Sequence, residues 1–232
     1  MPEMLFDLPE IPAIPMTDGS GLYPIGRIFC VGRNYAAHAA EMGNEVDREA
    51  PFYFTKSPAN AVRSGASLPY PPGTQDYHHE MELYMAIGTP VFQANADQAA
   101  QAIHGFGAAL DMTRRDLQGV AKEKRRPWDL GKDVEGSAVF GDLTPAAAFG
   151  FVGPQRILLS VNGNTRQDAY LADMIHTVTD VVSDLSQYYH LRPGDLILTG
   201  TPAGVGPVKP GDKVSGEIEG LSAVVLTLSD PA

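Results

Sequence analysis

The chain has 232 residues, of which 44% are hydrophobic and 19% charged, a composition typical of a globular protein with a sizeable core. Its formal net charge of −11 argues against a nucleic-acid-binding surface, because few cations are present to replace the counterions of a phosphate backbone. No apolar run approaches the roughly 18 residues of a membrane span, and no basic segment leads into an apolar stretch near the N-terminus. We therefore expect a cytoplasmic protein without membrane contact.

The first third of the chain is predicted to begin with an arm and to continue as strands. Residues 1–26 are rich in proline and have few periodic apolar positions, which indicates an extended N-terminal arm. Residues 27–232 contain no linker wide enough to divide them and are expected to form one domain. The elements expected next are a buried strand over 28–31 that contains the single cysteine, Cys30, a short helix over 35–41 capped by Asn34, a polar loop over 43–51, and strands over 51–56 and 78–87.

The rest of the chain alternates short helices with short strands, which predicts an α+β fold with a strand-rich core. The basic cluster over residues 122–126 is interpreted as a solvated helix end. The expected elements are a helix over 96–103 that begins near Asn95 or Asp97, a strand over 105–111, a helix from a Thr113 cap to about residue 124, a hairpin of 157–162 and 165–167 closed by Asn162-Gly163, a helix over 173–189, and two Pro-Gly-Asp turns over 192–195 and 209–212 that each lead into a strand.

Two glutamates in the 78–87 strand form the most informative pattern. Side chains alternate along a strand, so Glu80 and Glu82 point to the same face, about 7 Å apart along the strand. Two adjacent carboxylates repel unless a cation lies between them. The same alternation is also common on a half-exposed strand, and the pair alone leaves both interpretations open.

Asp111 adds a third carboxylate at the end of an apolar strand, although a turn or cap before Thr113 would also explain it. Three carboxylates without soft ligands select a hard cation, Mg²⁺ or Mn²⁺. Lys132 lies in a loop after a helix, where it is either solvated or, beside a metal, able to stabilise an oxyanion.

His38 and Glu41 lie three residues apart on a predicted helix and therefore on one face. A carboxylate bound to one imidazole nitrogen fixes the tautomer and raises the basicity of the other nitrogen, the arrangement of a general base. An exposed helical pair with no catalytic role fits the same spacing. Residues 198–206 follow a strand and carry three glycines, and this loop is either an anion cradle or a tight turn.

Together these motifs resemble the fumarylacetoacetate hydrolase family over residues 27–228. Within that family the chain is most similar to bacterial enzymes that cleave acylpyruvates, on residues 111–118, on Arg126-Pro127-Trp128 and on the Pro-rich arm. The matching segments are 32–38 with Glu41, 54–56, 79–82, 110–118, 131–132, 161–163 and 199–206.

The resemblance implies a mixed β-roll fold, a homodimer, and a Mg²⁺ or Mn²⁺ ion on Glu80, Glu82 and Asp111. Its implied substrate is a small 2-oxo acid, with fumarylpyruvate, cleaved to fumarate and pyruvate, the best match. The implied catalytic residues are His38, Glu41, Lys132 and Gln118, and the implied substrate-binding residues are Arg33, Tyr35, Lys56, Arg115, Gly200 and Thr201.

In the expected reaction His38, oriented by Glu41, activates water, while Lys132 and Gln118 stabilise the oxyanion. Arg33, Lys56 and Arg115 are the candidates for a distal carboxylate of the substrate, and residues 34–50 are expected to form a lid. Three alternatives remain at this stage: oxaloacetate decarboxylation, isomerisation and decarboxylation of a dienedioate, and a non-catalytic metal- or ligand-binding role.

Overall fold

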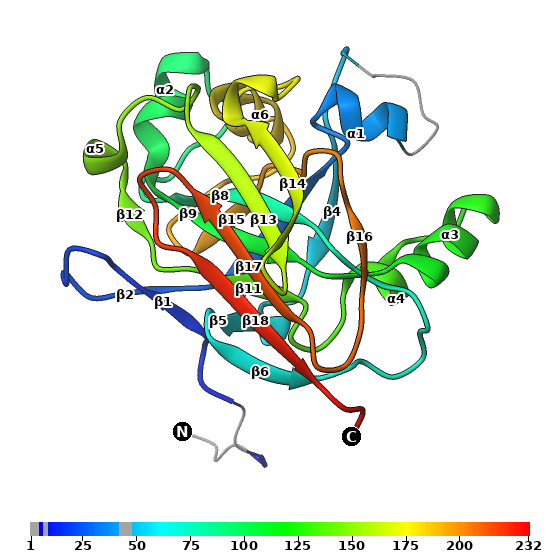
Figure 1. Cartoon of the computed structure of the whole chain (residues 1–232). Coiled ribbons are helices and arrows are strands. Elements are labelled where there is room, and N and C mark those ends of the chain that lie inside the picture. The colour runs from blue at the N-terminus through cyan, green and yellow to red at the C-terminus, as the bar shows by residue number, and fades with distance from the viewer. Residues whose placement is uncertain (1–4, 7–8, 42–47) are drawn as a thin grey trace.

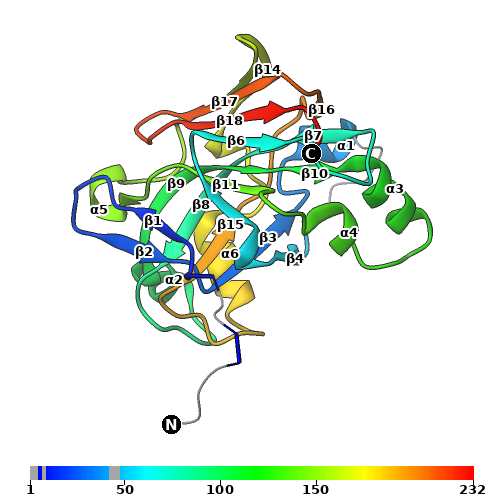
Figure 2. The ribbon, with the colours of Figure 1, turned by 90° about the horizontal axis from the view of Figure 1, so that it is seen from below.

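The computed structural model describes residues 5, 6, 9–41 and 48–232. Two packed sheets form the body, and short helices lie at its periphery (Figures 1 and 2). The predicted loop over 43–51 and the predicted lid over 34–50 fall partly outside the described residues. Among the described helices, none has the length and apolar character required to cross a membrane.

The larger sheet curls, and its strands carry the candidate residues Lys56, Glu82 and Asp111. Its strands run in the order β4 (Phe52–Lys56), β3 (Arg27–Gly32), β15 (Asp195–Leu198), β8 (Met81–Ile87), β9 (Ile103–Asp111), β11 (Ala138–Phe140) and β5 (Ala61–Arg63), and β12 (Thr144–Pro145) also pairs with β9. The pairs β15–β3 and β11–β5 are parallel and the others are antiparallel. The predicted α+β fold with mixed strand pairing is confirmed.

A second, five-stranded sheet packs over the first, as Figure 2 shows. Its order is β14 (Asn164–Tyr170), β13 (Arg156–Val161), β17 (Lys213–Ile218), β18 (Val224–Ser229) and β6 (Ala66–Pro69). A small sheet joins β10 (Thr113–Arg114), β7 (Tyr77–His79) and β16 (Gly206–Val208), and a hairpin joins β1 (Ala13–Pro15) and β2 (Leu22–Pro24).

The helices are α1 (Ala36–Glu41), α2 (Ala96–Ala102), α3 (Arg115–Glu123), α4 (Asp129–Lys132), α5 (Ala146–Phe149) and α6 (Val178–Leu185), with 3₁₀ turns at Pro58–Asn60 and Leu171–Asp173.

Both faces of β8 are buried, which decides how its glutamates are placed. Met81, Leu83, Met85 and Ile87 belong to the main core, which also includes residues of β13, β17, β18 and α6. Tyr84 on the opposite face belongs to a second apolar cluster, which the β1–β2 hairpin helps to cover. Because side chains alternate, Glu82 points to the face of Tyr84 and away from solvent. The buried Cys30 lies in that second cluster, as expected.

Three predicted helix starts differ from the observed ones. Thr113 pairs with His78 as part of β10, so α3 begins two residues later and has no side-chain cap. Asn34 does not cap α1, because its amide hydrogen-bonds to the backbone of His176 and Thr199. The helix predicted over 173–189 is shorter, since a capping box of Thr177 with Asp180 begins it at Val178.

Other local predictions are confirmed. Asn95 caps α2, and its side chain accepts a hydrogen bond from the amide of Gln98. The hairpin at Asn162-Gly163 joins β13 to β14, with Asn162 at a φ of 53° and Gly163 at 78°. The two Pro-Gly-Asp turns lead into β15 and β17 as predicted.

Candidate active site

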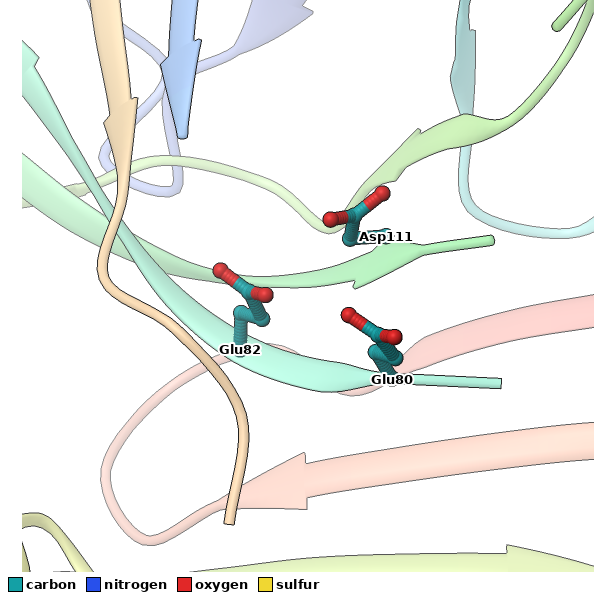
Figure 3. Close-up of side chains that lie close together, drawn as sticks. All are labelled: Glu80, Glu82 and Asp111. Atoms are coloured by element: carbon teal, nitrogen blue, oxygen red, sulfur yellow. The ribbon is translucent and has the colours of Figure 1, made fainter. Parts of the chain in front are cut away.

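Three buried carboxylates meet where β7, β8 and β9 come together. Glu80 lies between β7 and β8, Glu82 lies on β8, and Asp111 ends β9, with its amide bonded to the carbonyl of Glu80 at 2.9 Å. One oxygen from each side chain lies within 4.8 Å of the others, and all three side chains point into a common space (Figure 3). None is more than 5% exposed. The predicted grouping of these residues is therefore present in the fold.

Cations surround two of the three carboxylates. The Nζ atom of Lys132 lies 2.7 Å from Oε2 of Glu80 and 2.6 Å from Oδ2 of Asp111, and Arg115 forms an ion pair with Glu80. Lys56 approaches Oδ1 of Asp111 at 2.9 Å. Burial would raise the pKa of Glu80, but Lys132 and Arg115 outweigh burial and hold that pKa below its ordinary value.

Glu82 has a different environment. Its Oε2 atom accepts a hydrogen bond of 2.7 Å from the amide of Gly200, and no basic side chain in the described parts of the chain forms an ion pair with it. Burial, and then repulsion by Asp111 and Glu80, raise the pKa of Glu82 well above its ordinary value. A buried carboxylate of this kind requires a proton or a metal ion, and an all-oxygen donor set fits Mg²⁺ or Mn²⁺. The residues present therefore fit the expected ion.

Helix α1 carries the predicted general base. Nδ1 of His38 lies 3.4 Å from Oε2 of Glu41, a loose contact of the kind common before substrate binds. Burial lowers the pKa of His38 below its ordinary 6.5, although Glu80 and Glu41 oppose the shift. Glu41 also accepts the amide of Gly204, at 3.1 Å to each oxygen. The sequence-predicted pair is thus formed and is tied to the glycine-rich loop.

That loop, which follows β15, places Thr201 at the site. Gly200 has a φ of 89° and Gly204 one of 94°, and a Cβ on Gly204 would lie 2.0 Å from the carbonyl oxygen of Arg166. These positions therefore require glycine. From beneath the loop, the buried Gln167 donates hydrogen bonds to Oγ of Thr201 at 2.7 Å and to the carbonyl of Pro202 at 2.8 Å.

A single cavity collects most of the predicted residues. Gly32, Arg33, His38, Glu80, Glu82, Arg115, Gln118, Lys132 and Thr201 line it, together with Val31 and the four residues Phe52, Phe54, Lys122 and Trp128. Three predicted substrate-binding residues do not line this cavity. Tyr35 borders a separate cavity against Asp168 and Tyr170. Lys56 is fully buried beneath the carboxylates, and the amide of Gly200 is occupied by Glu82.

The structure corrects the interpretation of residues 122–126 as a purely solvated helix end. Lys122 is only partly exposed, and its Nζ atom lies over the ring of Trp128, 5.1 Å from the ring centre. The remaining basic residues of the cluster are exposed. Arg115, Gln118 and Lys122 are spaced i, i+3 and i+7 on α3, so helical periodicity contained a signal that Lys122 shares the face of the other two.

Comparisons with known proteins agree with this geometry. A family model described as "Fumarylacetoacetate (FAA) hydrolase C-terminal" matches residues 27–229. A fumarylpyruvate hydrolase of Ralstonia is 52% identical over 189 residues, covering 81% of this chain and 98% of that protein. An oxaloacetate tautomerase of Escherichia coli is 39% identical over 207 residues, covering 89% and 94%. The crystal structure of a Pseudomonas aeruginosa fumarylpyruvate hydrolase with Mn²⁺ and pyruvate superposes with a TM-score of 0.94, at 40% identity and 98% and 100% coverage.

Proposed function

The chain belongs to the fumarylacetoacetate hydrolase family, and on that basis we propose that it is a divalent-metal-dependent hydrolase that cleaves a carbon–carbon bond of an acylpyruvate. Fumarylpyruvate, split into fumarate and pyruvate, is the substrate that the comparisons favour. The carrying observation is that Glu80 and Glu82 line the same cavity as His38, with Asp111 and Glu41 directly behind them. One cavity thus combines a hard-cation site with a group able to activate water.

Glu80, Glu82 and Asp111 would hold the ion. When bound, Mg²⁺ or Mn²⁺ supplies Lewis acidity toward the 2-oxo acid end of the substrate. Thr201 would bind the substrate carboxylate, because its side chain lines the cavity and Gln167 donates to its oxygen. The hydroxyl hydrogen of Thr201 is then free to point toward a substrate oxygen.

His38 acts as the general base in this proposal. Glu41 accepts the Nδ1 hydrogen, which leaves Nε2 with a free lone pair for the proton of a water molecule. The low pKa of His38 keeps the imidazole neutral at pH 7, the state a base requires. Water deprotonated in this way attacks the distal carbonyl of the acylpyruvate, and the bond to the pyruvyl carbon then breaks. The acyl part leaves as a carboxylic acid, and the pyruvyl part leaves as an enolate that takes a proton on carbon from His38 to give pyruvate.

Lys132 and Gln118 would stabilise the negative charge that develops. Burial would lower the pKa of Lys132, but Asp111 and Glu80 outweigh burial and raise it above its ordinary value, so Lys132 stays cationic. Arg115 donates to Oε1 of Gln118 at 2.6 Å, which fixes the amide and directs its NH₂ group away from Arg115. A fixed cation and a fixed amide donor suit an oxyanion formed during attack.

A second candidate is tautomerisation of oxaloacetate, favoured by the 39% identity to the Escherichia coli tautomerase, or its decarboxylation, the activity named for a Dictyostelium discoideum relative at 38% identity. Decarboxylation uses the metal site but needs no hydrolytic water, so it does not account for the His38–Glu41 pair. Tautomerisation requires a proton transfer, which the His38–Glu41 pair would perform. The homodimer and the cytoplasmic location remain predictions from the sequence, and light scattering of the purified protein tests the first.

The deciding experiment compares wild type with His38→Ala on fumarylpyruvate and on oxaloacetate, with Mn²⁺ or with EDTA. We expect metal-dependent release of pyruvate from fumarylpyruvate and a loss of kcat of roughly 100-fold or more in the variant. Mn²⁺ affinity, measured by calorimetry, should be unchanged. Undiminished hydrolysis by His38→Ala would remove that residue from the mechanism. Turnover of oxaloacetate but not of fumarylpyruvate by the wild type would favour the second candidate, and its retention in the variant would favour decarboxylation over tautomerisation.

A further inference from the structure

Four basic side chains line the cavity, and the structure separates them into two kinds. Arg115 and Lys132 form ion pairs with Glu80, so their positive charges are already balanced by the carboxylate cluster. Arg33 and Lys122 also line the cavity, yet neither forms an ion pair with a carboxylate in the described part of the chain. In a protein with a net charge of −11, two cations without such a partner at the cavity wall indicate a site for an anion.

The surroundings of Lys122 are predominantly positive. The charged groups that act on it are Arg115, Arg33 and Lys132, with Glu80 the one opposing charge among the leading influences. Burial is the largest influence and, with the neighbouring cations, lowers the pKa of Lys122 to about 8. A partly buried cation among like charges is stabilised by an anion placed beside it. A substrate carboxylate would provide that charge.

Arg33 holds its guanidinium at the same wall from the turn between β3 and α1. Its backbone has a φ of 58°, a conformation uncommon for residues other than glycine, and such conformations are concentrated at functional sites. The guanidinium carbon lies 5.3 Å from the centre of the Phe52 ring. This contact positions the planar donor group of Arg33 without using its hydrogen-bonding capacity.

Aromatic rings form the wall between these cations. Phe52 and Trp128 meet edge to face with ring centres 5.4 Å apart, and Phe54 lies 5.9 Å from Trp128. The same three rings and Lys132 border an adjoining cavity of about 370 Å³. Flat apolar faces suit a planar conjugated chain, and the cations beside them suit a charge at its end.

We propose that Lys122 and Arg33, beside the rings of Trp128 and Phe52, form a subsite that binds the terminal carboxylate of a planar, unsaturated acyl tail. The subsite selects dicarboxylic acylpyruvates over those with a neutral tail. This inference rests on the proposed function for its substrate class. Of the three candidates that the sequence offered for the distal carboxylate, the subsite keeps Arg33. It gives the role predicted for Lys56 and Arg115 to Lys122 instead.

The kinetic test uses Lys122→Met, which removes the charge and retains a long apolar side chain against Trp128. The measured quantity is the ratio of kcat/KM for fumarylpyruvate to kcat/KM for acetylpyruvate, whose tail is a neutral methyl group. We expect this ratio to fall roughly 10- to 100-fold, mainly through KM, and to recover largely in Lys122→Arg. The matched control is Lys124→Met, an exposed lysine of the same cluster, which should leave the ratio unchanged. An unchanged ratio in Lys122→Met would overturn the subsite.

A binding test separates failure of the subsite from failure of the proposed function. Fumarate and crotonate share a planar four-carbon skeleton, but crotonate has a methyl group in place of one carboxylate. We expect the Mn²⁺-loaded wild type to bind fumarate at least 10-fold more tightly by calorimetry, and Lys122→Met to lose that preference. Equal binding of the two acids by wild type refutes the subsite. Retained preference for fumarate without cleavage of any acylpyruvate refutes the hydrolase function and leaves the subsite supported.

Discussion

The carboxylate of Glu41 accepts the backbone amide of Gly204, with both oxygens 3.1 Å from the nitrogen. The same carboxylate lies 3.4 Å from Nδ1 of His38, so one side chain joins the helix that carries the base to the loop that carries Thr201. Helix α1 has six residues, too few to hold a side chain precisely by itself. The contacts of Glu41 with His38 and with the Gly204 amide therefore help to hold the imidazole in place.

Glu41→Gln should lower kcat for acylpyruvate hydrolysis by about 10- to 100-fold, because the amide holds the imidazole less firmly and no longer favours its charged form. Glu41 raises the pKa of His38 in the wild type, so its loss should also move the acid limb of the rate profile to lower pH. Stopped-flow rates between pH 4 and pH 8 measure both effects. If kcat falls while the acid limb stays in place, Glu41 acts only on the loop and not on the base.

The wild-type pH profile should have two limbs with different origins. His38 acts as a base only when neutral, and burial places its pKa below 6.5, so kcat/KM should fall on the acid side only as the pH drops through that lowered value. Lys122 binds an anion only when charged, and its pKa is about 8. The kcat/KM for fumarylpyruvate relative to that for acetylpyruvate should therefore decrease above about pH 8.

Substitutions at Lys122 check the origin of the alkaline limb. Lys122→Arg should move the alkaline decrease in the ratio of the two kcat/KM values to higher pH, since arginine stays charged. In Lys122→Met the ratio should show no alkaline decrease. The charged groups facing Lys122 are Arg115, Arg33, Lys132 and Glu80, and none is altered in these variants. An alkaline limb that persists in the ratio for Lys122→Met would assign it to another group.

Metal binding should release protons. Without an ion, the raised pKa of Glu82 favours its protonated form, and a metal ligand must be deprotonated. We expect proton release to accompany Mn²⁺ binding, which calorimetry in buffers of different ionisation enthalpy measures. Glu82→Gln should bind Mn²⁺ far more weakly. Binding of the wild type without proton release would contradict a protonated Glu82 in the free site.

Part of the carboxylate cluster was predictable from local geometry. Glu80 and Glu82 share a face by strand alternation, and Asp111 ends the next strand of the sheet, so adjacent strands bring them together. The spacing of His38 and Glu41 on one helical turn is equally local. Alternation and helical spacing thus predicted which side chains share a face, whereas the assignment of Glu80, Glu82 and Asp111 to one metal site followed from the family resemblance.

Long-range contacts were not predictable in this way. Gln167 reaches Thr201 across 34 residues from a strand that is otherwise mostly exposed, and no periodic pattern distinguishes it from its neighbours. Lys56 was expected to contact substrate. Its side chain instead lies beneath the cavity, where it contacts Asp111 and Ser137. Burial of a charged side chain depends on the partners that tertiary packing supplies, and the sequence does not list them.

Lys56→Met should destabilise the protein by about 3–5 kcal/mol, because it removes one partner of a buried ion pair and leaves Asp111 less compensated. Urea unfolding measures this effect, with Lys124→Met as the exposed control, expected to change the free energy of unfolding by less than about 0.5 kcal/mol. A variant as stable as the control, with a lower selectivity for fumarylpyruvate, would instead support the sequence-based role of Lys56 in substrate binding.

Gln167→Leu should weaken binding at the pyruvyl end of the substrate without altering selectivity for the tail. In the wild type, Gln167 donates to Oγ of Thr201 at 2.7 Å, and its Oε1 accepts the amide of Met81 at 2.9 Å. Leucine is similar in size but leaves the hydroxyl of Thr201 without its fixed donor. KM should therefore rise by a similar factor, roughly 10-fold, for fumarylpyruvate and acetylpyruvate, with a stability cost of about 1–3 kcal/mol for the unpaired groups.

Gln167→Glu distinguishes a role in orienting the Thr201 hydroxyl from a purely structural one. A carboxylate at this position accepts the hydroxyl hydrogen instead of donating to the oxygen, and so turns the Thr201 donor away from the substrate. It also places negative charge beside the carbonyl of Pro202, which now accepts from Gln167 at 2.8 Å. We expect KM for both acylpyruvates to rise at least as much as in Gln167→Leu, and direct titration with pyruvate to show the same loss. A KM close to that of the wild type, in a variant that is destabilised but folded, would limit Gln167 to holding the loop.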